Sequence, residues 1–160
     1  MNYELSWRSL VFIILKHLIS RKFPSVAWLT TKELAQWLND SSQPQLLLLD
    51  ARNEAEYETS HLQYAKRIDP HHSNLEAVTS SKDTLIVVYC SVGYRSARIA
   101  DRLQQAGCDR VYNLEGSIFK WANEKRPLYK NERPTTIVHP YNQLWGQLLN
   151  KRSRASVKLG

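Results

Sequence analysis

The apolar positions of this chain fall into short runs separated by segments with helical periodicity. Three runs have the length of a strand and are rich in leucine, β-branched or aromatic residues. They are residues 46–49, 85–89 and 111–114. Apolar strands that alternate with helices are typical of a parallel sheet covered on both faces. The pattern therefore predicts an α/β fold with three layers, in which a mostly parallel central sheet has helices on both faces.

Start and stop signals place two helices beside these strands. Thr30 stands three residues before Glu33, which is the pattern of a capping box, and a short helix is predicted from there to about Asn39. Apolar residues recur at helical spacing over residues 96–106, and Gly107 supplies the stop signal. The strand, loop and helix over residues 85–106 thus form one well-marked unit.

The N-terminal segment has its own apolar run, residues 10–15, which is too short to span a bilayer. A cleaved secretory signal is not indicated either, because Arg8 is the one early cation before the run. The spacing predicts an amphipathic helix that ends before Pro24 and docks on the domain, with a dimer contact or shallow membrane docking as alternatives. The predicted docking face is Trp7, Leu10, Val11, Ile14 and Leu18.

The C-terminal part is proline-rich and then basic. Residues 127–140 hold three prolines and are predicted to be an extended connector, and residues 141–150 a last helix. We therefore divide the chain into an N-terminal helix (1–25), a central domain (26–128) and a basic extension (129–160).

Charge is distributed unevenly over the 160 residues. The chain carries a net charge of +7, but residues 26–119 carry −3 and residues 120–160 carry +7. This distribution argues against a nucleic-acid surface along the whole chain. The basic end is predicted to be solvated, with a phosphate or membrane contact as the alternative. Its cations include Lys151, Arg152, Arg154 and Lys158.

Two cysteines, Cys90 and Cys108, are separated by 17 residues, with no Cys-x-x-Cys spacing. Neither a disulfide framework nor a zinc site is indicated, so we expect a reducing cytoplasm. His71 and His72 are adjacent but have no third ligand in view, so no metal site is predicted. Cys108 is expected to lie far from Cys90 and not to act as a resolving thiol.

Cys90 directly follows the strand 85–89 and precedes a helix that is predicted to begin near Ser96. Ligands of parallel sheets bind beyond the carboxyl ends of the strands, where a helix N-terminus offers free N–H groups. Such surroundings, with nearby arginines, lower the pKa of a thiol and favour the nucleophilic thiolate. The candidate site is Cys90 as nucleophile with Ser91, Val92, Gly93, Tyr94, Arg95, Ser96 and Arg98 around it.

The loop at residues 89–96 (YCSVGYRS) resembles the active-site loop of rhodanese-like sulfurtransferases. Two other stretches are similar to signatures of the same family, and the resemblance covers roughly residues 26–128. They are residues 50–57 (DARNEAEY) with 60–62 (SHL), and residues 111–117 (VYNLEGS) with Trp121. Ser60, Tyr64 and Ser117 depart from the pattern, because glycine is usual at those positions.

The resemblance implies a rhodanese-like fold and a sulfur atom carried on Cys90 as a persulfide. The donor would be thiosulfate or another small-molecule or protein sulfur donor, and the acceptor a thiol or cyanide, with no metal or organic cofactor. Arg95 would bind the anionic donor. Asp50 and Arg52, at the end of an earlier strand, either flank the pocket or hold loops together as ion pairs. His61 is left outside the catalytic set.

Two other functions stay open at this stage. A phosphatase or arsenate reductase of the Cys-x5-Arg type is disfavoured, because Arg95 is the fifth residue after Cys90 and the loop is one residue short. A non-catalytic binding or regulatory module is weakened, but not excluded, by the intact cysteine and arginine.

Overall fold

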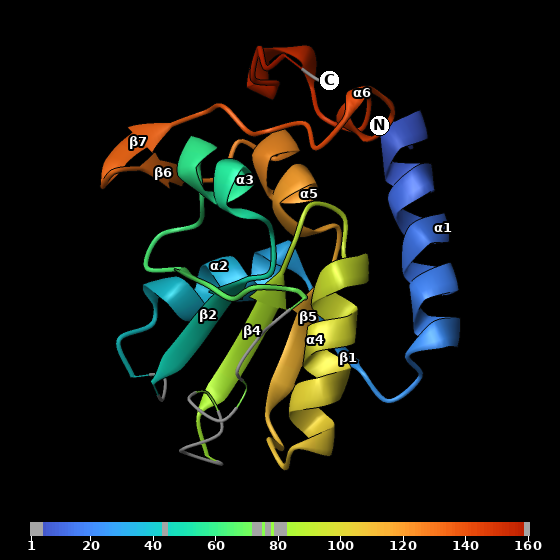
Figure 1. The fold of residues 1–160 in the computed structure, drawn as a ribbon, viewed down its shortest axis with the longest axis vertical. Helices are drawn as coiled ribbons and strands as arrows, with labels where there is room; N and C mark the ends of the chain where they lie inside the picture. The colour runs from blue at the N-terminus through green and yellow to red at the C-terminus, as the bar shows by residue number, and fades with distance from the viewer. Residues whose placement is uncertain (1–4, 43–44, 72–74, 76–77, 79–82, 159–160) are drawn as a thin grey trace.

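The computed structural model describes residues 5–42, 45–71, 75, 78 and 83–158 (Figure 1). The helices are α1 (Trp7–Lys22), α2 (Thr31–Asn39), α3 (Glu54–Thr59), α4 (Tyr94–Gln105), α5 (Ser117–Asn123), α6 (Gln143–Gly146) and the 3-10 turn η1 (Lys151–Ser153). The strands are β1 (Ala27–Leu29), β2 (Leu46–Asp50), β3 (Lys66–Arg67), β4 (Leu85–Tyr89), β5 (Val111–Leu114), β6 (Leu128–Lys130) and β7 (Arg133–Thr135).

A parallel sheet forms the centre of the protein. Within the described residues it has five strands in the order β1-β5-β4-β2-β3, and every neighbouring pair is parallel. All five residues of the central strand β4 are buried. The predicted parallel sheet is therefore confirmed. The edge strands β1 and β3 were not predicted, because strands of three and two residues carry no readable periodicity.

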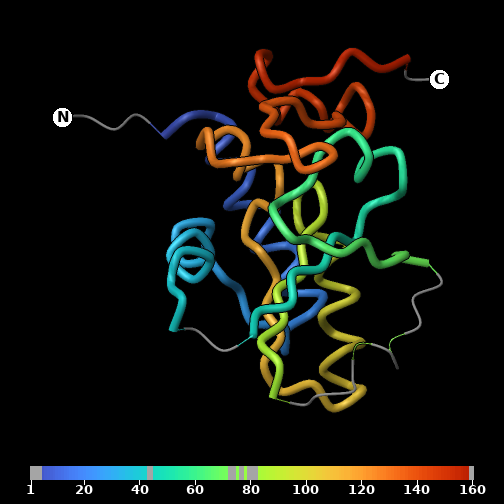
Figure 2. The backbone as a smooth tube through the Cα atoms, turned by 90° about the vertical axis from the view of Figure 1, so that its left-hand side faces the viewer, coloured from blue at the N-terminus to red at the C-terminus, as the bar shows by residue number. Residues whose placement is uncertain are grey.

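Helices cover both faces of the sheet, as predicted. One core cluster joins α2 and α5 to one face through residues such as Leu34, Val87 and Phe119. The other joins α4 to the opposite face through Ile99 and Val88. Figure 2 shows α2 and α4 on opposite sides of the strands. The α2 capping box between Thr30 and Glu33 is also present.

Helix α1 forms as predicted, but the predicted docking face is wrong. Its buried residues are Phe12 and Ile19, with Val11 and Leu15 partly buried against the core. The other four residues of the predicted face, Trp7, Leu10, Ile14 and Leu18, are about half exposed. The helix is apolar on nearly every side, so the sequence does not show which side meets the domain. Within the described part of the chain, no helix is both long and apolar enough to cross a membrane.

The backbone of the C-terminal extension packs on the domain, while its cations Lys151, Arg152 and Lys158 stay exposed to solvent. The predicted connector contains the β6–β7 hairpin, and the predicted last helix is one turn, α6. Leu148 and Leu149 are buried in the core. The N–H of Val138 donates to the carbonyl of Ser153 at 2.7 Å, which ties down the basic end. Charge alone predicted the exposure of the basic side chains, but not the apolar contacts that hold the backbone of the extension.

Candidate functional site

The site is built around Cys90, the first residue after β4. Its sulfur accepts a hydrogen bond from the backbone N–H of Gly93 at 3.1 Å and one from Ser96 Oγ at 3.4 Å. Both donors belong to the start of α4, which begins at Tyr94, two residues earlier than predicted. Cys90 Sγ therefore lies at the N-terminus of α4, where the free N–H groups and the helix dipole favour a negative charge.

The backbone of the loop is held from β5 and α5. Gly93 is the N-cap of α4 with a φ of 116°, a left-handed conformation that glycine adopts without strain. The Asn113 side-chain amide donates to the Gly93 carbonyl at 2.9 Å, and the Cys90 N–H donates to Ser117 Oγ at 3.1 Å. Ser117 itself has a φ of 48°, so this serine keeps the backbone conformation usual for glycine and adds a hydroxyl that holds Cys90.

A buried carboxylate, Glu56, fixes the loop arginine. Arg95 Nη1 and Nη2 donate to the two Glu56 carboxylate oxygens at 2.8 Å each, and Nη2 also donates to Ser91 Oγ. Glu56 is completely buried. Burial raises the pKa of Glu56, but hydrogen bonds from Arg95 and its positive charge outweigh that effect and leave the pKa lowered. Glu56 was absent from the predicted site, although the Asn53–Glu56 capping spacing was readable.

The same surroundings activate the thiol. Burial raises the pKa of Cys90, but the positive charge of Arg95 and hydrogen bonds from Ser96 and Gly93 lower it by more. The net shift is downward, towards the thiolate. At Cys108, burial and the nearby Asp109 carboxylate raise the pKa instead. The pKa values of the two cysteines are thus shifted in opposite directions.

A cavity of about 170 Å³ opens above Cys90. Its walls come from the loop, including Val92 and Tyr94, and from two aromatic residues of the extension, Tyr141 and Trp145. Sequence analysis missed both of these aromatic residues, because they lie outside the resemblance and no local pattern connects them to the loop.

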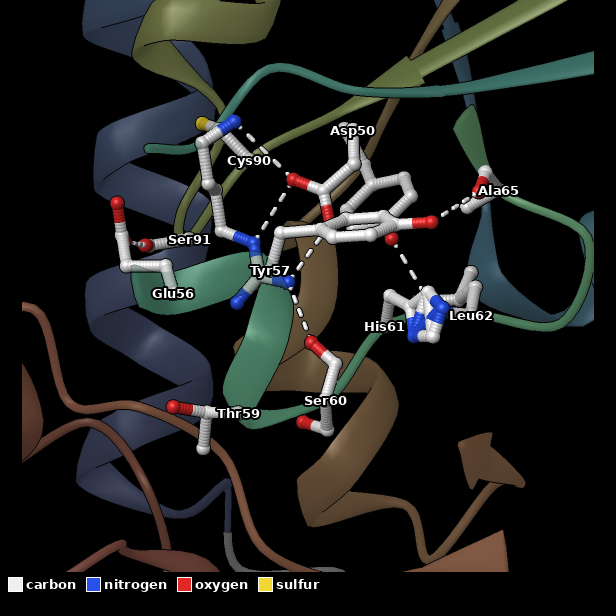
Figure 3. A network of polar contacts seen from close by, with 12 residues as sticks. Asp50, Glu56, Tyr57, Thr59, Ser60, His61, Leu62, Ala65, Cys90 and Ser91 are labelled. Carbon is white, nitrogen blue, oxygen red and sulfur yellow. Dashed lines mark hydrogen bonds and ion pairs between the residues drawn. The ribbon is translucent and has the colours of Figure 1, made fainter. Parts of the chain in front are cut away.

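Five predicted site residues do not line this cavity. Gly93 and Ser96 instead donate hydrogen bonds to Cys90 Sγ, and Arg98, Asp50 and Arg52 have other contacts. Arg98 Nη2 donates to the Pro70 carbonyl at 2.9 Å, and Asp50 and Arg52 form a completely buried ion pair at 2.6 Å. Arg52 also donates to the Ser60 carbonyl, so the pair holds the loop before β3. Figure 3 shows Asp50 and Ser60 in this network. Of the two alternatives for Asp50 and Arg52, the geometry matches the one in which they hold loops together.

His61 also has a structural contact, since its Nδ1 lies 2.8 Å from the Tyr129 carbonyl. A larger hollow of about 430 Å³ beside His61 contains no cysteine. Among the described residues, no group of three His, Cys, Asp or Glu side chains is placed to hold a metal. His72 lies outside the described residues.

Comparison with known proteins agrees with this architecture. The Rhodanese-like domain family matches residues 30–124, and the chain belongs to that family. Among curated proteins it is 30% identical over 106 residues to a tRNA uridine(34) hydroxylase of Erwinia tasmaniensis and 31% identical over 105 residues to one of Escherichia coli. The matches cover 62% of this chain but 29% of those relatives, so the chain spans less than a third of their length.

Solved structures show the same fold. A Bacillus halodurans protein aligns with a TM-score of 0.63 at 19% identity, covering 85% of this chain and 97% of that one. A Rhodopseudomonas palustris protein described as a possible tyrosine phosphatase aligns with a TM-score of 0.58 at 24% identity, covering 72% and 93%.

Proposed function

We propose that the protein is a sulfurtransferase that carries a sulfane sulfur on Cys90 as a persulfide. The observation that carries this proposal is the position of Cys90 Sγ at the start of α4, within hydrogen-bond distance of Gly93 N and Ser96 Oγ. The Cys90 thiolate that starts and ends the reaction is anionic at Sγ, and donors that already point at this atom stabilise it without reorganisation. The lowered pKa of Cys90 favours the thiolate needed for the first step.

In the first half-reaction, the Cys90 thiolate attacks the outer sulfur of a donor such as thiosulfate. A sulfur–sulfur bond to Cys90 forms, the donor's own sulfur–sulfur bond breaks, and sulfite leaves with the electron pair. In the second, an acceptor thiolate attacks the terminal sulfur and Cys90 departs as a thiolate. The two steps balance without an oxidant, a metal or an organic cofactor. Either a small molecule or a protein would serve as donor or acceptor.

The phosphatase alternative is supported less well. That chemistry uses a Cys-x5-Arg loop, whereas Arg95 is the fifth residue after Cys90, so the loop of this chain is one residue short. The possible phosphatase among the solved structures shares the fold at 24% identity, which is too low to assign its activity to this chain. We therefore expect hydrolysis of aryl phosphates to stay at background.

The curated relatives carry the name tRNA uridine(34) hydroxylase, and this chain covers 29% of their length. A role in tRNA modification would require RNA binding that weakens with salt. The basic end offers exposed Lys151 and Arg152 for such a contact. Among the described residues, no other feature favours RNA, so sulfur transfer remains the proposal.

The test is a mass measurement on the reduced chain. After incubation with thiosulfate, or with a persulfide donor, the intact mass is expected to increase by one sulfur atom, and addition of a thiol or cyanide is expected to reverse the increase. If neither donor loads Cys90, the non-catalytic binding module replaces the enzyme. If the protein hydrolyses aryl phosphates through Cys90 but accepts no sulfur, the phosphatase replaces it.

A further inference from the structure

The outward face of α1 carries an apolar patch that the catalytic site does not use. Its members, which we call the α1 patch, are Leu5, Trp7, Leu10, Ile13, Ile14 and Leu18, each between 49% and 62% exposed. The helix lies along the side of the molecule (Figure 1), and its inner face is already occupied by the contacts of Phe12 and Ile19 with the core. Single exposed apolar residues are ordinary, but a contiguous set on one helix marks an interaction surface.

The charges on α1 itself all have the same sign, and one of its cations, Lys16, is paired with Glu115 at 2.8 Å. Residues 5–22 contain two lysines and two arginines and no aspartate or glutamate. Arg21 and His17 are exposed, at four-residue spacings from Ile13 along the same face of the helix. The Arg8 guanidinium carbon lies 4.7 Å from the ring centre of Trp7, at the opposite end of the patch.

We propose that the α1 patch docks on the surface of an anionic lipid bilayer. The apolar side chains would enter the boundary between headgroups and acyl chains, with Trp7 at the interface, and Arg21 would contact lipid phosphates. Arg8 is held on the domain, because its Nε donates to the Gln147 carbonyl at 3.0 Å. An interfacial helix combines an apolar face with cations in this way. The helix would lie in the plane of the surface, because its inner face is packed on the domain.

A second copy of this chain fits the patch less well. Two such helices would bring cations together with no anion from either helix. A bilayer that contains anionic lipids supplies the complementary charge.

Docking would also place the candidate active site near the lipid surface. Lys22, in the last turn of α1, donates to the Tyr94 hydroxyl at 2.5 Å, and the Phe23 and Tyr94 rings meet edge to face at 5.8 Å. Tyr94 is part of the cavity above Cys90. The proposal itself does not depend on sulfur transfer, because it rests on the exposed face alone.

The test is co-sedimentation of the full chain with two kinds of vesicle, phosphatidylcholine alone and phosphatidylcholine mixed with phosphatidylglycerol. We expect binding to the anionic vesicles, at least tenfold weaker binding to the neutral ones, and loss of binding at high salt. The triple substitution Leu10→Ser, Ile14→Ser, Leu18→Ser is expected to abolish it. Since these side chains are half exposed, the variant should keep the thermal midpoint of the wild type, and the single substitution Leu10→Asp provides a milder second variant.

The matched control removes exposed apolar residues elsewhere, in Leu144→Ser combined with Ile137→Ser, and should bind vesicles like the wild type. Absence of binding to anionic vesicles would overturn the proposal, as would binding that survives both α1 variants. Sedimentation of the wild type as a dimer in solution, with the triple variant a monomer, would overturn it too and identify a second copy as the partner.

Discussion

The guanidinium carbon of Arg95 lies 4.9 Å from the ring centre of Tyr141. This contact joins the family loop to a residue that lies outside the matched range of 30–124. Tyr94, Tyr141 and Trp145 line the cavity together with Arg95, so much of its wall is aromatic. The extension therefore completes the site as well as packing on the domain.

We predict that Trp145→Ala widens access to Cys90. Removal of the indole takes away one wall of the cavity, so a bulky maleimide should alkylate Cys90 several-fold faster relative to the small reagent iodoacetamide. The measurement is the ratio of the two second-order rates. Leu144→Ala, on the same helical turn but 71% exposed and outside the cavity, should leave the ratio unchanged. An unchanged ratio in Trp145→Ala would show that the indole does not limit access.

Sulfur transfer should depend on Cys90 alone among the two cysteines. Cys90→Ser is expected to lose activity below detection, because an alcohol at that position is neither a thiolate nor a sulfur carrier. Cys108→Ser should keep the wild-type rate, since Cys108 packs in the core at the far end of α4. Both variants are compared by sulfur loading and turnover with the same donor. A disulfide between the two cysteines after persulfide discharge would contradict this assignment.

The thiol of Cys90 should react at a lower pH than an ordinary cysteine. Its pKa in the folded protein is lowered, so the midpoint of its alkylation profile should lie at a lower pH than that of an ordinary thiol. The lowered pKa of Cys90 also contributes to the stability of the fold. This contribution is fully present above the pKa of Cys90 in the unfolded chain and is lost as the pH falls through its pKa in the folded protein. Arg95→Gln should move the profile to higher pH, because it removes the largest favourable interaction. Cys108, whose pKa is raised, provides the internal comparison.

Glu56→Gln should destabilise the protein by about 2 kcal/mol, because the substitution leaves Arg95 without its buried partner. This expected loss of unfolding free energy is smaller than is usual when a buried ion pair is broken, because the Arg95 side chain is 19% exposed. Because the pKa of Glu56 is lowered, its contribution to the stability of the fold is present above about pH 4.3. This contribution is lost as the pH falls through the pKa of Glu56 in the folded protein. Urea unfolding of both proteins at pH 7 and in acid measures the difference.

The control is Arg126→Gln, which breaks a more exposed ion pair with Glu124. Exposed pairs contribute about 0–1 kcal/mol, so this variant should differ little from the wild type at either pH. Equal destabilisation by the two substitutions would mean that Glu56 has no special structural role.

Much of the fold could be predicted from local sequence patterns. The apolar runs that became β2, β4 and β5 are fully or largely buried, and burial on both sides is what produces an apolar run. The α2 capping box is a local hydrogen-bond pattern and was readable for the same reason. The docking face of α1 was not readable, because an almost uniformly apolar helix has no polar side to indicate its orientation.

The candidate site also has one part that the sequence predicted and another part that it did not. Cys90, Gly93 and Ser96 are neighbours in sequence, so a strand end followed by a helix start predicted their meeting. Glu56 reaches the site from 39 residues away, and Tyr141 from the extension. Such contacts depend on how the layers pack, which the spacing of residues along the chain does not record.

The anchoring of the Cys90 loop from later parts of the chain has a consequence for biosynthesis. Asn113 and Ser117 hold the loop backbone, and the cavity wall is complete at Trp145. A ribosome adding about 5–20 residues per second takes roughly 3–11 s to travel from codon 90 to codon 145. During that time Cys90 lacks the complete wall of its cavity. The cavity can therefore close only after residue 145 has been made, later than the loop that contains the cysteine.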